Sequence, residues 1–310
     1  MQILTETRID FMSRRRQASL FSVAVLLIAL AALLFRSLNF GIDFTGGTLI
    51  EVGYSTSADL EQVRQQLSEQ GFDEAVVQHF GSASEVLIRI PPQEQLSSAA
   101  ASDQIVRALK LTDESVELRR QEFVGPQVGE ELTEDGGLAM IYALIGILIY
   151  VALRFEYRFA FGAIIALVHD VVIVLGVFAL LQLEFDLTVL AAILAVIGYS
   201  LNDTIVVFDR IRENFLLLRK GSSEEVINRS LNDTLSRTLM TSLTTLLVLL
   251  ALFMLGGELI HAFASALIIG VLVGTYSSIY VASSAILALG ISREDLMPPE
   301  REGADIDGMP

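Results

Sequence analysis

The sequence predicts a membrane all-α protein, a bundle of six transmembrane helices in a 1+5 arrangement, with a small exported α+β domain inserted after the first helix. Hydrophobic residues make up 53% of the 310 positions, and the mean hydropathy of +0.58 is too high for a soluble domain of this size. Six separate apolar runs are each about long enough to cross a bilayer. The segment 36–135 instead carries short alternating elements, which is typical of a folded domain in water.

The first apolar run, 18–35, follows the basic residues Arg14, Arg15 and Arg16. This start resembles a cleavable export signal, but the run continues past the small residues 29–31 to about the length that spans a bilayer. We therefore predict an uncleaved first span, preceded by an N-terminal segment 1–17.

The segment 36–135 is predicted to form a domain with the order β-α-β-β-α-β, which is the ferredoxin-like split unit. The predicted strands and helices are 48–54, 57–70, 75–80, 85–90, 97–111 and 115–124, with a turn at 81–84. The domain has 7 basic and 18 acidic residues, a balance of −11. Solubility explains these acids more simply than a specific cation or substrate site does.

Five further spans are predicted within the region 136–289, with a long loop at 209–238 and a tail at 290–310. They cover 136–153, 160–181, 187–208, 239–255 and 262–289. The N-terminus, the second-to-third connection and the loop 209–238 are rich in Arg and Lys, whereas the short loops 182–186 and 256–261 contain none. The positive-inside rule therefore places both termini in the cytoplasm and the domain 36–135 outside.

Composition excludes several classes of function. The formal net charge is −16, and no glycine-rich phosphate loop is present, so neither nucleic acid nor ATP is expected as a ligand. The chain contains no Cys, and its three His residues lie far apart in sequence. We therefore expect no metal, no cofactor and no enzymatic activity.

The fourth apolar run contains an ionisable residue, Asp203. A carboxyl group inside a membrane span costs about 3 kcal/mol on insertion-based scales, so it needs a partner or a task. Two interpretations are open: a permanently protonated acid that joins two helices, or a carboxyl that gains and loses a proton. We favour the second. The predicted supporting polar residues are Tyr199, Ser200, Asn202 and Thr204 on this span and Thr241, Ser242 and Thr245 on the fifth.

Two more residues are candidates for the same task. Asp170, beside His169 on the third span, would lie roughly 15 Å deep, although it is nearly as well explained as a contact between helices. Arg237 begins the fifth span on the cytoplasmic side, which lets it approach Asp203. An ordinary boundary arginine is the alternative for Arg237, and packing is the alternative for the hydroxyl stripe on its helix.

Three motifs occur in a fixed order between these spans. GIDFTGG at 41–47 contributes Gly41, Asp43, Gly46 and Gly47, of which the glycines favour a turn that Asp43 caps. VGPQVGEEL at 124–132 contains Gly125 and Pro126, and GYSLNDTIVVFDRIREN covers 198–214. With these motifs, the sequence resembles the SecD/SecF family of protein-export membrane proteins, in the resistance-nodulation-division superfamily, as far as about residue 292.

The resemblance implies a function. A SecF-like protein pairs with SecD and assists the SecYEG channel, with YajC, at the bacterial inner membrane. It uses the proton-motive force to complete the translocation of unfolded polypeptide, so protons are also its partners. The family's functional acid falls on Asp203, and its basic partner falls on Arg237.

Three rival functions remain. An intramembrane aspartyl protease would also place carboxyls on neighbouring helices, but Asp203 lacks a preceding Gly-x-Gly. A proton-driven exporter of small molecules or lipids usually needs two such halves in one chain and larger exported domains. A purely scaffolding subunit would tolerate Asp203→Asn.

Overall fold

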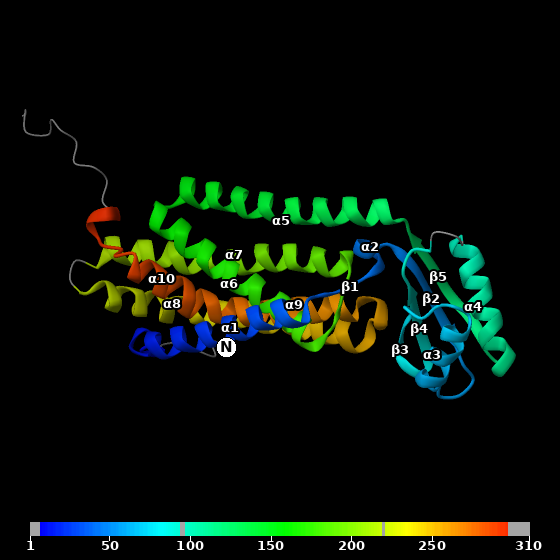
Figure 1. Cartoon of the computed structure of the whole chain (residues 1–310). Coiled ribbons are helices and arrows are strands. Elements are labelled where there is room, and N and C mark those ends of the chain that lie inside the picture. Colours follow the sequence, from blue (N-terminus) through cyan, green and yellow to red (C-terminus); the bar gives the residue numbers. More distant parts are fainter. Residues whose placement is uncertain (1–6, 94–96, 219–220, 297–310) are drawn as a thin grey trace, which may run out of the picture.

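The computed structural model describes residues 7–93, 97–218 and 221–296. Within these ranges, six helices are long and apolar enough to cross a membrane, which agrees with the six predicted spans. Figure 1 shows them side by side along one axis. They are α1 (Arg15–Arg36), α5 (Pro126–Arg154), α6 (Tyr157–Leu181), α7 (Leu187–Leu217), α8 (Ser223–Leu255), and α9 (His261–Ser277), which continues through a π-helical turn (Ser278–Ala282) into α10 (Ser283–Ala288).

Several helices extend beyond the apolar runs that predict them. Helix α5 starts with Pro126 in its first turn, where a missing N–H is tolerated. Helix α8 starts at a capping box formed by Ser222 and Glu225. Because α7 ends only at Leu217 and α8 begins at Ser223, most of the predicted loop 209–238 is helical. In the charged ends of these helices, backbone N–H and C=O groups are paired within the helix or by caps, so these turns need no apolar environment.

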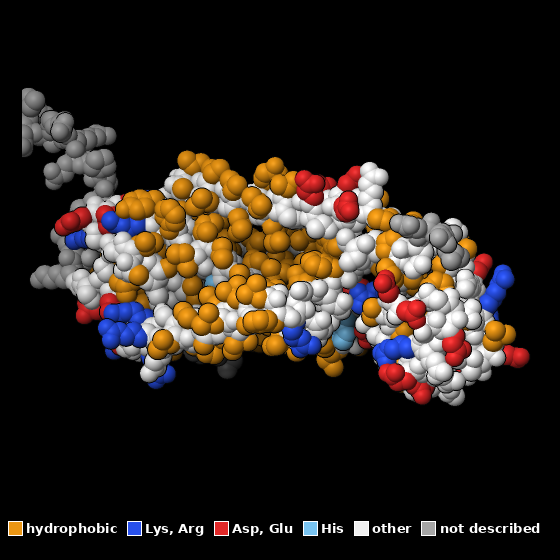
Figure 2. Space-filling model, in the orientation of Figure 1, with side chains coloured by type: hydrophobic (Ala, Val, Ile, Leu, Met, Phe, Trp, Pro, Cys, Tyr) orange, Lys and Arg blue, Asp and Glu red, His pale blue; other side chains and the backbone are white. Residues whose placement is uncertain are grey.

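The helices α6 and α7 form the centre of the bundle. In an apolar stretch of 18 residues within each helix, half of the residues of α6 and 56% of those of α7 are buried, against 11% of those of α5. Close approach is local: a Cβ on Gly176 of α6 would lie 2.3 Å from Ala29 Cβ of α1, and one on Gly270 of α9 would lie 2.2 Å from Val196 of α7. Figure 2 shows hydrophobic side chains over the visible face of the bundle and charged ones towards its two ends.

The segment between α1 and α5 carries a four-stranded antiparallel sheet with two helices (Figure 1). Its elements are β2 (Gly47–Gly53), α3 (Leu60–Glu69), β3 (Val76–Phe80), β4 (Ser82–Ile90), α4 (Ser98–Thr112) and β5 (Glu117–Val124), with strand order β3-β4-β2-β5. Asp59 and Ser97 cap the two helices through their side chains. Ile50, Ile88 and Ile105 are fully buried in the core between sheet and helices.

One predicted element of this domain was wrong. The turn expected at 81–84 is shorter, because Gly81 adopts a φ of +73° and Phe80 already pairs with Ser82. A left-handed glycine reverses the chain without steric cost. Ser82–Ser84 therefore belong to β4.

Short elements join the sheet domain to the bundle. Strand β1 (Asn39–Phe40) pairs in parallel with β6 (Glu184–Phe185), which lies between α6 and α7, and α2 (Ile42–Thr45) follows β1. The remaining short helical turns are Met12–Arg14, Glu258–Ile260 and Glu294–Leu296.

Candidate functional site

Asp203 lies in the middle of α7 and is 8% exposed. Its carboxylate accepts hydrogen bonds from two neighbouring helices. Thr238 of α8 donates from Oγ1 at 2.7 Å, and Ser278, the first residue of the π-helical turn, donates from Oγ at 2.5 Å. Hydroxyl donors to a charged acceptor are among the stronger hydrogen bonds in proteins. Asp203 therefore holds three helices together at one point.

Asp170 lies on α6 and is 1% exposed. Its Oδ2 accepts from Ser200 Oγ of α7 at 2.6 Å and from Ser277 Oγ of α9 at 2.7 Å. Its Oδ1 lies 2.9 Å from Nδ1 of His169, which is also buried. Asp170 is thus a second buried acid with its own set of polar partners.

The two acids are linked through consecutive serines. Ser277 contacts Asp170, whereas Ser278 contacts Asp203, at the junction between α9 and the π-helical turn. Gly274, one turn earlier, lets α9 approach α7, because a Cβ there would lie 3.1 Å from Ser200 Cβ. Short π-helical segments occur frequently at functional sites. Here the junction of α9 with this segment directs two adjacent hydroxyl groups to two different carboxyls.

Arg237 lies on α8, one residue before Thr238, and its side chain is exposed. In the described part of the chain, no hydrogen bond or ion pair joins Arg237 to Asp203. The predicted pair is therefore neighbouring but not in contact in this structure.

The predicted supporting residues separate into two groups. Ser200 contacts Asp170 rather than Asp203, and Ser242 shares a 2.6 Å hydrogen bond with Thr275 of α9. The other five make no side-chain contact with either acid among the hydrogen bonds described: Tyr199, Asn202, Thr204, Thr241 and Thr245.

Sequence reasoning missed Ser278 as a site residue. It also did not single out Thr238 or Ser277. The signal available in the sequence was a pair of adjacent serines, Ser277 and Ser278, within an otherwise apolar span. No group of three or more side chains suited to holding a metal ion occurs in the described ranges.

The glycine motif forms a tight junction between the sheet domain and α5. Gly46 has a φ of +68°, and a Cβ there would lie 2.9 Å from Cα of Pro126. Gly47 has a φ of +125°, and a Cβ there would lie 2.4 Å from the carbonyl oxygen of Ile90. Any side chain at these positions would clash with backbone atoms. The first two sequence motifs, which include Gly125 and Pro126, are therefore in direct contact.

Asp43 of this motif caps a helix rather than a turn. Its Oδ2 accepts a hydrogen bond at 2.9 Å from the backbone N–H of Leu187, the first residue of α7. Asp186 caps the same end through the N–H of Val189 at 2.8 Å. Gly41, two residues before Asp43 in the motif, donates its N–H to the carbonyl oxygen of Phe185 at 2.9 Å. The motif is thus fastened to the helix that carries Asp203.

A buried ion pair lies beside this junction. Arg89 of β4 is 8% exposed and donates to the carbonyl oxygen of Phe40 at 3.2 Å and to Oδ1 of Asn39 at 3.3 Å. It also reaches Oε1 of Glu184 at 3.4 Å. Burial raises the pKa of Glu184, while the charge of Arg89 opposes this rise. Arg89 therefore connects the sheet domain to the strands at the end of the bundle.

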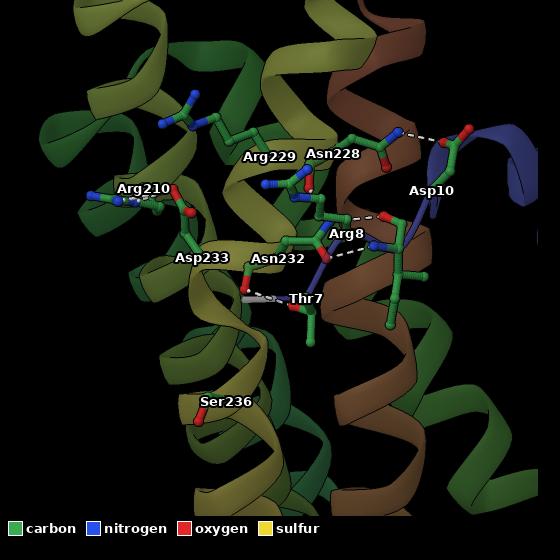
Figure 3. Close-up of a pocket in the computed structure, with 10 residues that line it drawn as sticks. Thr7, Arg8, Asp10, Arg210, Asn228, Arg229, Asn232, Asp233 and Ser236 are labelled. Atoms are coloured by element: carbon green, nitrogen blue, oxygen red, sulfur yellow. Dashed lines mark hydrogen bonds and ion pairs between the residues drawn. The ribbon is translucent and has the colours of Figure 1, made fainter. Parts of the chain in front are cut away.

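At the other end of the bundle, the N-terminal segment docks on α8 and borders a polar hollow of about 700 Å³ (Figure 3). Asn232 exchanges two 2.8 Å hydrogen bonds with the backbone of Ile9. Asn228 donates to Asp10 at 2.5 Å and accepts from the N–H of Met12 at 3.0 Å. The hydrogen bond from Asn228 is the largest cause of a lowered pKa at Asp10, and the backbone N–H of Ser13 lowers it further.

Comparison with known proteins shows which family has this arrangement of a glycine motif and two buried acids. Residues 31–58, which contain the glycine motif, match a family model described as "SecD/SecF GG Motif". Residues 104–292, which contain both acids, match "Protein export membrane protein SecD/SecF, C-terminal". The chain belongs to the SecD/SecF family. Six apolar helices and this membership make it a multi-pass membrane protein.

Individual members of the SecD/SecF family are similar over the whole chain. "Protein translocase subunit SecF" of Vibrio alginolyticus is 56% identical over 313 residues, covering 100% of this chain and 99% of that one. The Pseudomonas aeruginosa protein of the same name is 50% identical over 294 residues, covering 94% of this chain and 95% of that one.

A solved structure of the SecD/SecF family is also similar. The crystal structure of SecDF from Thermus thermophilus, described as a translocon-associated membrane protein, superposes with a TM-score of 0.84 at 42% identity. The match covers 91% of this chain but 39% of that one. The chain thus spans well under half of the SecDF chain that it resembles.

Proposed function

We propose that the chain is the SecF-like subunit of a Sec translocase accessory complex in a bacterial inner membrane. It acts with SecD, the SecYEG channel and YajC, and it uses the proton-motive force to complete the translocation of unfolded polypeptide. The observation that carries this proposal is a buried carboxyl, Asp203, which in the described part of the chain accepts hydrogen bonds from hydroxyl donors between three helices. An acid at such a position is functional by default.

The hydroxyl partners can follow a change of charge. A serine has one O–H to donate, and each of the paired serines has a second acceptor within reach. Ser278 lies 3.1 Å from the carbonyl oxygen of Thr275, and Ser277 lies 3.2 Å from that of Gly274. When Asp203 binds a proton, Ser278 can turn to the backbone and release α7. Asp170 would be a second carboxyl that binds and releases a proton, and Arg237 would modulate the proton affinity of Asp203.

The driving force is sufficient for such a switch. One proton crossing about 100 mV supplies roughly 2.3 kcal/mol. That energy biases a two-state arrangement by more than tenfold. The helices would be displaced against one another, and the motion would reach the exported domain 36–135.

We further propose that this exported domain is ferredoxin-like and that the membrane region is arranged as one span before it and five after it. The strand order β3-β4-β2-β5 and the alternation of two helices with four strands support the first assignment. The basic residues at the ends away from the domain support cytoplasmic positions for segment 1–17 and tail 290–310.

The alternative functions have less support. A proton-driven exporter of small molecules or lipids is not favoured, because relatives over the whole chain are named as protein translocase subunits. An aspartyl protease needs two carboxyls that act on one substrate. Asp170 and Asp203 instead accept from separate hydroxyl groups.

Export into inverted membrane vesicles tests the proposal. With an imposed proton gradient, we expect Asp203→Asn to abolish the gradient-stimulated part of polypeptide translocation while leaving the ATP-driven part. Asp209→Asn is a matched control, because Asp209 is on the same helix but is exposed and pairs with Arg154 at 3.3 Å. Copurification with SecD shows that the variant assembles. Stimulation that survives in an assembled Asp203→Asn complex contradicts the proposal.

A further inference from the structure

A groove outside the acid site lies between α1, α6 and α10. It consists of two adjoining hollows of about 550 and 600 Å³, which share Ser19, Val23, Ser284 and Ala288. The walls of the deeper hollow are mostly aliphatic, and Val23 is 52% exposed although it faces the groove. The groove is therefore an apolar depression in the membrane-facing surface.

The groove is one membrane leaflet deep. It starts at Arg16 and ends near Leu26 on α1, which is about 15 Å at 1.5 Å per residue. On the opposite wall it runs from Ala288 to Tyr280, about 12 Å. The hydrocarbon core of a bilayer is about 30 Å thick, so one leaflet is about 15 Å.

Beyond this depth the groove is closed. The helices α1 and α6 meet directly there, because a Cβ on Gly176 would lie 2.3 Å from Ala29 Cβ. The groove is about half as long as the roughly 30 Å that a transmembrane helix of a partner would occupy. An acyl chain of one leaflet fits the observed length.

The mouth of the groove is basic. Arg15 and Arg16 line it, and Arg14 precedes them. Arg15 is paired with Glu224 at 2.5 Å. Arg16 is exposed, and no hydrogen bond or ion pair involves its side chain in the described part of the chain. Basic pockets between membrane helices suit anionic headgroups at the cytoplasmic surface.

We infer that this groove binds one anionic phospholipid of the cytoplasmic leaflet. An acyl chain lies between α1 and α10, and the headgroup phosphate contacts Arg16. The inner end of the groove is lined by His169, whose Nδ1 lies 2.9 Å from Oδ1 of Asp170 in the acid site. The lipid therefore packs against a residue of the site without entering it.

Native mass spectrometry of the full chain, purified together with SecD, tests this inference. The complex is released from nanodiscs that contain phosphatidylethanolamine, phosphatidylglycerol and cardiolipin. We expect one anionic phospholipid to be retained in preference to phosphatidylethanolamine. Arg16→Gln should lower its retention about fivefold, whereas Arg212→Gln, the same charge change on α7, should not.

A second pair of variants tests the acyl part of the groove. Ser19→Phe should abolish retention, because the ring would occupy the part of the groove that the two hollows share. Ala24→Phe places the same ring on an exposed position of α1 that does not line the groove, and it should retain the lipid. A photoreactive residue in place of Val23 should cross-link to lipid.

Three results would overturn the inference. They are equal retention of zwitterionic and anionic lipids, equal effects of Ser19→Phe and Ala24→Phe, and cross-linking of position 23 to SecD instead of lipid. The last result would assign the groove to the partner protein. The assignment to the cytoplasmic leaflet rests on the orientation given under the proposed function. None of these readouts depends on proton coupling, so failure of the lipid site and failure of the coupling can be told apart.

Discussion

Replacing Arg89 by Met should loosen the junction between the sheet domain and the membrane helices in a manner that depends on pH. Arg89 is buried and contacts Glu184, which lies on the strand between α6 and α7. Removing one partner of a buried ion pair leaves the other charge without compensation, which typically costs about 3–5 kcal/mol. Methionine preserves much of the side-chain volume, so the loss is mainly one of charge and hydrogen bonds.

Protonation of Glu184 limits the size of this effect. Its ordinary pKa is 4.5, so adding a proton at pH 7 costs at most about 3.4 kcal/mol, at 1.36 kcal/mol per pH unit. At pH 5 the same limit is about 0.7 kcal/mol. Burial already raises the pKa of Glu184 in the folded protein. The docked state therefore binds more protons than the open state, and its stability falls as pH rises through that pKa.

Hydrogen exchange at Gly41 measures the opening of the junction. Its N–H donates to the carbonyl oxygen of Phe185 at 2.9 Å, across the β1–β6 pair. In Arg89→Met, the charge-dependent acceleration over wild type should reach up to about 300-fold at pH 7 and about threefold at pH 5. Comparison at equal pH cancels the intrinsic exchange rate. Lost hydrogen bonds to Phe40 and Asn39 add a contribution that does not depend on pH.

Two further variants make this prediction decisive. In the double variant Arg89→Met/Glu184→Gln, the pH-dependent part should disappear. Arg119→Met is the control, because its pair with Glu117 at 3.2 Å is exposed and such pairs contribute about 0–1 kcal/mol. An acceleration in Arg89→Met that is the same at pH 5 and pH 7 would refute the reasoning.

Three other outcomes are expected. Ser278→Ala removes a donor to Asp203 and should lower gradient-stimulated translocation about tenfold. The control Ser265→Ala removes a hydrogen bond to the carbonyl oxygen of His261 in the same helix and should leave translocation unchanged. Equal effects of the two variants would contradict a role for Ser278 at Asp203. Gly176→Leu should lower the free energy of unfolding by about 1–3 kcal/mol in thermal denaturation, because it overpacks the α1–α6 contact, while Gly146→Ala, with open space around it, should be neutral. Asn232→Leu should speed hydrogen exchange at Ile9 about tenfold, and no change would mean that the N-terminal segment is held by other contacts.

The helices and strands followed from the sequence where one physical signal dominated. Apolar runs and alternating strand patterns located the six long helices and the four strands of the sheet domain. The ends of α5, α7 and α8 did not follow, because charged helical turns outside the membrane have no hydropathy signal. Their boundaries depend on local caps such as Ser222 and on packing between helices.

The candidate site was only partly predictable, for a related reason. Asp203 and Asp170 were identifiable because a buried acid is costly wherever it lies. Their partners were not, because Ser278 faces Asp203 only through the local helix register at the π-helical turn. Arg89 alternates with apolar residues in its strand and therefore looks solvent-exposed. In the structure it contacts the distant strand pair at 39–40 and 184–185 instead of solvent.

A single helix connects the acid site with the sheet domain. Asp203 lies about 24 Å along α7 from Leu187, whose N–H is held by Asp43 of the glycine motif. An α-helix with intact hydrogen bonds transmits a displacement along its axis, and the glycine motif leaves little space to absorb it, because Gly47 packs against the backbone of Ile90. A shift of α7 caused by a charge change at Asp203 would therefore move β2 and the sheet behind it. We therefore propose that the tight glycine junction and the buried acid are two ends of the same mechanical path.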